Sequence, residues 1–342
     1  MKLSEYFYDL PEGFIASEPP AVRGSSRLLV LGRESGEILD RNYRDLPEFL
    51  RAGDVVVLND TKVMPARIIV EKKNGAKREL IILEKRLGDA DWHRHRVLHR
   101  GSLRAGDRLR VGEFEVRVEE VLGDGVAVVS AKTDLLEIAS KYGAPPLPPY
   151  MRREANAEDV ERYQTVFARE MGSAAAPTAS LNMTEEIIEG LREKGVRVVY
   201  LTLHVGLGTF LPIRTDEVTE HKMHAEYFSI PSYTVEAIRG ARAGGGRVVA
   251  VGTTVTRTLE FAALDIFSGV SGDVAGEADI FIYPGYEFKV VDALLTNFHA
   301  PKSTVLMMAA GFVGKERLFE AYEHAKRGGY RFLSYGDSML IL

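Results

Sequence analysis

The chain has 342 residues, of which 45% are hydrophobic and 27% charged, enough apolar material for packed cores in two or three domains. Its net charge is −5, and its longest uninterrupted apolar stretch, residues 305–313, is nine residues long, too short for a membrane span. Cysteine is absent, which excludes disulfides, thiolate zinc sites and thiol nucleophiles. Since residues 1–14 hold no continuous apolar segment, the sequence predicts a cytoplasmic protein with no membrane partner.

The first half of the chain is rich in short β-type runs. SRLLVL (26–31) and DVVVLND (54–60) predict two strands, and residues 65–132 then hold five further runs separated by turn signals such as Asn74-Gly75. These runs are ARIIVE, ELIILEK, DRLRVG, FEVRVEEVL and VAVVSA. Short strands at this spacing predict a small barrel or sandwich. Four prolines within residues 144–150 then mark a domain junction.

Helices and strands alternate in the second half. Thr184 is predicted to cap a helix that stops at Gly195, and Ser232 to begin another that runs through Arg242. We further expect strands at 196–203, 247–251, 279–283 and 330–335, an apolar run at 289–296, and helices over 256–264, from 303 and over 315–327. Such alternation is typical of an α/β layer. The predicted fold class is therefore a layered α/β main domain (1–64 plus 145–342) with an inserted small all-β barrel domain (65–144).

Basic residues are concentrated in residues 61–110. This segment holds 14 lysines and arginines against six acidic residues, a net charge of +8 in a chain that is acidic overall. Such asymmetry is typical of a protein in which one part meets a phosphate backbone, although a solvated basic surface is the alternative. If the segment binds RNA, reversing Arg96, Arg100 and Arg104 to Glu is expected to weaken that binding.

A glycine-containing motif, HVGLGTF, follows the predicted strand 196–203. Glycines there let backbone N–H groups approach a ligand, so Gly206, Gly208 and Thr209 are candidate binding residues. The dinucleotide fingerprint would need a glycine where Leu211 stands, which argues against a nicotinamide site. A structural turn is the alternative.

Polar residues also follow three other predicted strands, where open α/β sheets place their ligands. They are Asn59, Asp60 and Thr61 after residue 58, Thr253, Thr254 and Arg257 after residue 251, and Asn297 and His299 after the apolar run. Hydroxyls, helix N-terminal amides and a guanidinium suit a carboxylate, a ribose or a phosphate. Turn formation and helix capping by Thr256 are the alternatives.

Two histidines, His221 and His224, lie three residues apart beside Glu220 and Glu226. A metal site needs a third well-placed ligand, and the HExxH pattern is absent, so we predict no metal. We expect acid–base or hydrogen-bonding roles for these histidines, with a purely structural pair as the alternative.

Taken together, ordered blocks over nearly the whole chain resemble one family, the S-adenosylmethionine:tRNA ribosyltransferase-isomerases of queuosine biosynthesis. The blocks include LPEGFIASEPP, VVLNDTKVMPARI, YGAPPLPPYM, ERYQTVFARE, TLHVGLGTFLPIR, EHKMHAEYF and AVGTTVTRTLE. The resemblance implies transfer of the ribosyl part of S-adenosylmethionine onto 7-aminomethyl-7-deazaguanine at the tRNA wobble position, giving epoxyqueuosine and releasing adenine and methionine. S-adenosylmethionine is then a co-substrate, with no other cofactor expected. The implied partner is the tRNA anticodon stem-loop, and we expect a monomer.

In the mechanism that the resemblance implies, a base removes a proton from the 5′ carbon beside the sulfonium, and adenine is expelled. The aminomethyl nitrogen then attacks, and an epoxide closes as methionine departs. This chemistry needs a general base, a proton donor to adenine and a clamp for the amino-acid end. We expect His204, His224 and His299 to transfer protons, and Arg214 and Arg257 to hold the methionyl carboxylate or a tRNA phosphate.

One block departs from the family's pattern PTAGLHF, at Ser180, Asn182 and Met183. Asn can replace a hydrogen bond but cannot shuttle a proton, so a catalytically altered paralogue that only binds tRNA or RNA is the alternative function. A methyltransferase is a third hypothesis, which the incomplete glycine fingerprint disfavours.

Overall fold

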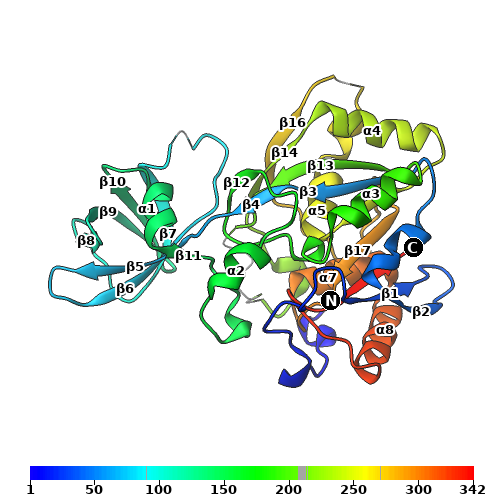
Figure 1. Ribbon diagram of the computed structural model, residues 1–342, viewed down its shortest axis with the longest axis horizontal. Helices are drawn as coiled ribbons and strands as arrows, with labels where there is room; N and C mark the ends of the chain where they lie inside the picture. The colour runs from blue at the N-terminus through cyan, green and yellow to red at the C-terminus, as the bar shows by residue number, and fades with distance from the viewer. Residues whose placement is uncertain (90, 207–212, 214, 270) are drawn as a thin grey trace.

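The computed structural model describes residues 1–89, 91–206, 213, 215–269 and 271–342 (Figure 1). A large mixed sheet with helices on both faces forms one part, and a β-barrel projects from it. A parallel pair of short strands, β4 (Thr61–Val63) and β12 (Glu170–Ser173), lies between the two parts.

The large sheet has nine strands among the described residues. In spatial order they are β16 (Val274–Ala278), β14 (Glu226–Ile230), β13 (Arg197–Leu203), β3 (Val55–Asn59), β15 (Val248–Val251), β17 (Ala293–Asn297), β18 (Ser338–Ile341), β1 (Arg27–Leu31) and β2 (Ile38–Asn42). The four central strands β13, β3, β15 and β17 run parallel to one another. Strands of this kind are covered on both faces, which explains why β3 is apolar up to its last residue and buried throughout.

Helices pack on both faces of this sheet. Outside the barrel the α-helices are α2 (Ala157–Arg162), α3 (Glu185–Glu193), α4 (Ser232–Ala243), α5 (Thr253–Phe261), α6 (Ala263–Phe267), α7 (Thr304–Val313) and α8 (Lys315–Arg327). Short 3₁₀ helices are η1 (Leu3–Tyr6), η2 (Glu12–Phe14), η3 (Tyr43–Phe49), η4 (Pro149–Met151), η5 (Thr178–Ser180) and η7 (Val218–Glu220). Val57 of β3 packs in the core shared with α4 to α8, whereas Leu58 packs in the core shared with α3 and η3.

The barrel consists of six strands that close on themselves. In order around the barrel they are β5 (Arg67–Lys72), β6 (Lys77–Ile82), β7 (Arg94–Arg100), β10 (Val126–Ala131), β9 (Phe114–Gly123) and β8 (Arg108–Val111), with β8 pairing back onto β5. Helix α1 (Leu135–Tyr142) packs into its separate core, and the chain leaves through β11 (Gly143–Ala144), which pairs with β5. Because the six strands form a closed ring in this order, β7 and β8 lie on opposite sides of the barrel.

The expected fold class, a layered α/β part with an inserted all-β barrel, is confirmed. Helix α3 is capped as predicted, since the Thr184 side chain accepts a hydrogen bond from the Ile187 N–H at 3.3 Å. Helix α8 also covers the predicted residues. The division of the chain at 64/65 and 144/145 stays a prediction.

Several expected elements were wrong or missed. Residues 279–283 are not a strand; the strand in this region is β16, which ends just before them. Residues 330–335 are not a strand either, because Leu333 has a left-handed φ of 70°. Helix α5 begins three residues earlier than expected, at Thr253. Strand β7 and helix α1 were missed. In β7, arginines and histidines hide the strand pattern, because His95 is buried and packs against Trp92 with ring centroids 4.4 Å apart and ring planes tilted by 46°.

Candidate active site

Four parallel strands, β13, β3, β15 and β17, end at one edge of the large sheet. Asn59 and Asn297 are the last residues of β3 and β17, and His204 and Thr253 lie one and two residues beyond the ends of β13 and β15. Since all four strands point the same way, these residues meet at that edge, the place where open α/β sheets bind ligands. The polar strand ends seen in the sequence therefore belong to one neighbourhood.

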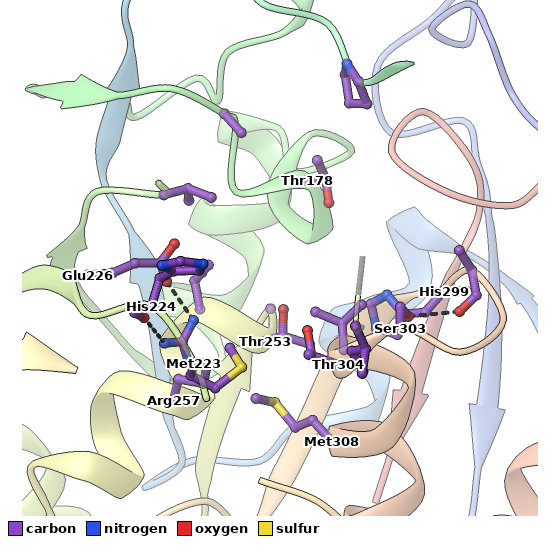
Figure 2. Close-up of a pocket in the computed structure, with 18 of the residues that line it drawn as sticks. Thr178, Met223, His224, Glu226, Thr253, Arg257, His299, Ser303, Thr304 and Met308 are labelled. Atoms are coloured by element: carbon purple, nitrogen blue, oxygen red, sulfur yellow. Dashed lines mark hydrogen bonds and ion pairs between the residues drawn. The ribbon is translucent and has the colours of Figure 1, made fainter. Parts of the chain in front are cut away.

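A cavity of about 1030 Å³ opens at this edge, between the sheet and the barrel. The residues singled out in the sequence that line it are His221, His224, Thr253, Thr254, Arg257, Asn297 and His299. The barrel contributes Arg86, Arg96 and the β9–β10 turn at Asp124. Figure 2 shows His224, Glu226 and Arg257 on one side and His299 on the other, with Thr253 between them. The cavity is at the upper end of the volumes usual for small-molecule sites.

Unpaired polar groups are concentrated around this cavity. In the described part of the chain, nine buried side-chain polar atoms have no hydrogen-bond partner, and five of them belong to cavity-lining residues. These five are Arg96 Nη2, Tyr163 Oη, Thr215 Oγ1, Arg257 Nε and Asn297 Nδ2. Arg96 Nη2 makes no hydrogen bond but lies 3.7 Å from Glu84 Oε1 as a long ion pair. Because buried polar groups in proteins are nearly always paired, this concentration indicates a polar ligand that completes the site.

The amide of Asn297 is held in one orientation. The Thr178 hydroxyl donates to Asn297 Oδ1 at 2.9 Å, while Nδ2 of the same buried side chain has no partner. A fixed oxygen leaves the amide only its N–H groups to offer to a ligand. Figure 2 shows Thr178 above Thr253 in the same cavity. Asn297 is therefore a preoriented hydrogen-bond donor.

His299 lies in the cavity wall as a neutral imidazole. Its Nε2 is 2.8 Å from the Thr296 hydroxyl, and its backbone N–H donates to the Tyr322 hydroxyl at 2.9 Å. Burial lowers the pKa of His299 to about 3. At neutral pH this ring therefore exchanges hydrogen bonds with a ligand in its uncharged form and is a weak base.

His204 lies behind the cavity wall. Its Nδ1 is 2.8 Å from the Thr61 hydroxyl, and its ring stacks on Tyr227. A Cβ at Gly172 would lie 2.7 Å from Nε2, so the opposite side of the ring is closed by backbone. Burial, reinforced by Lys85, lowers the pKa of His204 to about 4. His204 itself does not line the cavity, whereas the next residue in the chain, Val205, does.

Arg257 already has a protein partner for its charge. Its Nη1 donates to Glu226 Oε2 at 2.5 Å and its Nη2 to the Ala278 carbonyl at 3.0 Å, which leaves Nε free of partners. The second Glu226 oxygen accepts the backbone N–H of Gly206 at 2.7 Å. The guanidinium, expected to clamp an anion, is thus fixed mainly by Glu226 at the cavity wall (Figure 2).

Helix α5 presents an uncapped N-terminus to the cavity. Gly252, with a φ of 97°, stands at the N-cap position and offers no side chain, so the first N–H groups of the helix lack a capping side chain. Thr253 and Thr254 of the first turn line the cavity. This end of the cavity is suited to a carboxylate.

Asn59, Asp60 and Thr61 do not line the cavity. The Asn59 side-chain amide donates to the Leu203 carbonyl and accepts from the Leu203 N–H, and it also donates to Thr254 Oγ1 at 3.4 Å. Asp60 Oδ1 accepts the Thr202 hydroxyl at 2.7 Å, and burial raises the pKa of its carboxyl. Expected as ligand contacts, these residues instead join β3 to the segments that form the wall.

Gly206 makes a close contact between the sheet and the barrel. A Cβ there would lie 2.5 Å from the carboxyl carbon of Glu84, a buried barrel residue whose pKa is raised by that burial. The glycine is thus needed for backbone approach to protein rather than to ligand. Gly208, Thr209 and Arg214, also expected in the site, lie outside the described residues.

The two lowered histidine pKa values predict an acid-sensitive fold. In the unfolded chain both imidazoles titrate near 6.5, so below that pH the unfolded state binds more protons, and the stability present above about pH 6.5 is lost toward pH 4. Each group contributes a slope of about 1.4 kcal/mol per pH unit. Between pH 7 and pH 5, the free energy of unfolding measured in urea should fall less steeply with decreasing pH in His204→Gln than in wild type, by about 1 kcal/mol per pH unit. An unchanged slope, or an equal change in the exposed control His93→Gln, would contradict this.

Sequence reasoning missed Thr178, Tyr163 and Thr215 as cavity residues. Thr178 lies in the departing block and Tyr163 in the block ERYQTVFARE, and Thr215 directly follows TLHVGLGTFLPIR, but no strand end or chemical pattern singled these residues out. No group of three or more potential metal ligands occurs among the described residues. No helix in those residues is long and apolar enough to cross a membrane.

Comparison with known proteins places the chain in a family. A sequence model described as "Queuosine biosynthesis protein" matches residues 3–341. The chain belongs to this family. The S-adenosylmethionine:tRNA ribosyltransferase-isomerases of Chlorobium phaeobacteroides and Geobacter sulfurreducens are 57% and 47% identical to it over the full length of both chains. A crystal structure of S-adenosylmethionine tRNA ribosyltransferase from Thermotoga maritima is 35% identical, with a TM-score of 0.57, and covers 99% of this chain and 100% of its own.

The family expected from the sequence blocks is confirmed, and the expected function agrees with the names of these queuosine-family relatives. Asn182, one of the departures from the family pattern, does not line the cavity. That side chain is buried between the Ser26 hydroxyl and the Gly336 carbonyl, at 2.8 and 3.1 Å, and Met183 lies in the core. Nothing in the described residues therefore favours the altered-paralogue alternative.

Proposed function

We propose that this chain transfers and isomerises the ribosyl group of S-adenosylmethionine onto 7-aminomethyl-7-deazaguanine at the tRNA wobble position, as a ribosyltransferase-isomerase. The products are epoxyqueuosine in tRNA, adenine and methionine. The observation that carries the proposal is the cavity, which has five residues with buried polar atoms that make no hydrogen bond and lies between the sheet edge and the basic barrel. Its volume leaves room for a nucleoside and for a base extruded from the RNA.

The geometry supports a division of roles among the cavity residues. The uncapped N-terminus of α5, with Thr253 and Thr254, suits the methionyl carboxylate. The fixed amide of Asn297 suits an acceptor on the departing adenine, where negative charge develops as the glycosidic bond breaks. Arg257, whose charge is balanced by Glu226, offers its Nε–H, which has no hydrogen-bond partner, to a ligand at the cavity wall.

Proton removal from the 5′ carbon needs a base whose pKa is near the working pH. His299, with a pKa of about 3, serves better as a neutral hydrogen-bond partner, and His204 is enclosed behind the wall. His224 lines the cavity and is exposed, so we assign the base to it. His204 then acts as a positioning residue through Thr61.

The barrel supplies the expected tRNA contact. Arg94 and Arg100 are exposed on β7, the strand whose Arg96 lines the cavity. Exposed arginines on the strand that reaches the cavity suit the phosphates of an anticodon stem-loop whose wobble base enters the cavity. With tRNA as substrate, we propose a cytoplasmic location and action as a monomer.

The test is product analysis. Purified protein, S-adenosylmethionine and tRNA carrying the deazaguanine precursor should yield epoxyqueuosine by nucleoside mass spectrometry, with adenine released in equal amount. His224→Gln should abolish the product while S-adenosylmethionine binding, measured by calorimetry, persists. A methylated base, or RNA binding without adenine release, would overturn the proposal.

A further inference from the structure

The segment Tyr6-Phe7-Tyr8, here called the aromatic strap, alternates in burial. Tyr6 and Tyr8 are 2% and 8% exposed, whereas Phe7 between them is 59% exposed. Phe7 has extended backbone, in which successive side chains point to opposite sides. The two tyrosines therefore anchor the strap and leave the Phe7 ring outside.

The aromatic strap is attached to the wall of the cavity. The Lys302 N–H donates to the Tyr6 carbonyl at 2.9 Å, and the Tyr8 hydroxyl donates to the His299 carbonyl. Both His299 and Lys302 line the cavity. Phe7 lies between these two attachments, and its ring centroid is 5.2 Å from the ammonium of the cavity-lining Lys302, so the exposed ring lies beside the cavity.

Each ring of the aromatic strap has a lysine ammonium nearby. Lys315, Lys302 and Lys326 lie 5.7, 5.2 and 5.8 Å from the ring centroids of Tyr6, Phe7 and Tyr8. Two of these lysines are paired with acids, since Lys315 lies 3.9 Å from Glu5 and Lys326 2.6 Å from Glu323. Among the described residues no ion pair involves Lys302, so its charge is available to a ligand. Lys302 also has a φ of 58°, an unfavourable backbone conformation for a lysine that the bond to Tyr6 holds in place.

We infer that Phe7 and Lys302 form a contact site for the nucleotide next to the one that enters the cavity, with the base on Phe7 and its phosphate on Lys302. Single-stranded RNA loops are bound in this way, by aromatic rings that take unstacked bases and cations that take the backbone. The inference rests on the proposed function and adds a second RNA contact, separate from the barrel. It uses the exposed aromatic ring, which the reaction itself does not need.

The test compares Phe7→Ala and Phe7→Trp on anticodon stem-loops that carry the deazaguanine precursor. One RNA is intact, and two others lack the base on the 5′ or the 3′ side of it. Phe7→Ala should raise KM for the intact RNA about tenfold, and Phe7→Trp should stay near wild type. On one of the two abasic RNAs, the wild-type KM should be raised by the same factor as Phe7→Ala raises it on the intact RNA. On that abasic RNA, Phe7→Ala should raise the KM no further. As a control, Phe267→Ala removes an exposed ring that does not line the cavity, and it should leave the KM for each of the three RNAs unchanged.

An unchanged RNA KM in Phe7→Ala, or the full additional loss on both abasic RNAs, would overturn the stacking contact. Lys302→Asn removes the charge with a residue that tolerates left-handed backbone, and should lower the salt slope of RNA binding by about one. An unchanged slope would overturn the phosphate contact. These failures are distinct from failure of the proposed function, in which the wild type itself forms no epoxyqueuosine.

Discussion

Replacing Asn297 by Asp should lower kcat/KM for adenine release by about a hundredfold, the cost of removing one preoriented donor from a buried site. The amide Nδ2 is buried without a partner at the cavity, and the Thr178 hydroxyl fixes the amide oxygen. A carboxylate has the same shape and still accepts from Thr178, but it cannot donate to the leaving group. Steady-state adenine release, followed by chromatography, measures the effect.

Thr178 provides the matched control for this result. Thr178→Ser keeps the hydroxyl and should retain nearly full activity, whereas Thr178→Val frees the amide to rotate and should cost about tenfold. Circular dichroism and thermal unfolding check that the variants fold. If Asn297→Asp retains kcat/KM within threefold of wild type, the amide is not a donor to the reacting nucleoside.

The sequence predicted where the site lies better than it predicted what each residue does. Strand direction is a property of alternating helices and strands, so the meeting of Asn297 and Thr253 at one edge followed from their positions after β17 and β15. Which side of the cavity wall a residue occupies depends on tertiary packing. Asn59 and His204 are polar strand-end residues like Asn297, yet their hydrogen bonds are used within the protein.

Secondary structure failed where packing overrides local pattern. The run at 330–335 has β-type composition, but Tyr330 and Phe332 pack in the aromatic cluster around Phe298, and Leu333 turns the chain. Strand β7 escaped detection because its arginines lie on the outer face while its buried His95 looks polar in sequence. Neither feature could be inferred from periodicity alone.

The charge on the barrel should act through its position rather than its amount. The structure removes two of the three arginines chosen from the sequence as stem-loop contacts. Arg96 is half-buried, lies 3.7 Å from Glu84 and lines the cavity, and Arg104 lies in the β7–β8 loop. Of the three, Arg100 remains, and Arg94, which was not chosen from the sequence, is a second exposed arginine on β7. Reversing these two to Glu should weaken tRNA binding by about tenfold or more and reduce the salt slope by at least about two.

The opposite side of the barrel offers a control with the same change of net charge. Arg108 and Arg110 are exposed on β8, across the barrel from β7, and β8 contributes none of the residues that line the cavity. Reversing them to Glu should leave the tRNA affinity within about threefold of wild type, since a general field effect of two exposed charges is largely screened at physiological salt. Filter binding at several salt concentrations compares the two double variants, with S-adenosylmethionine affinity as the check on folding. Equal losses from both would mean that the barrel attracts RNA only by its overall charge, and β7 would not be the face that holds the stem-loop.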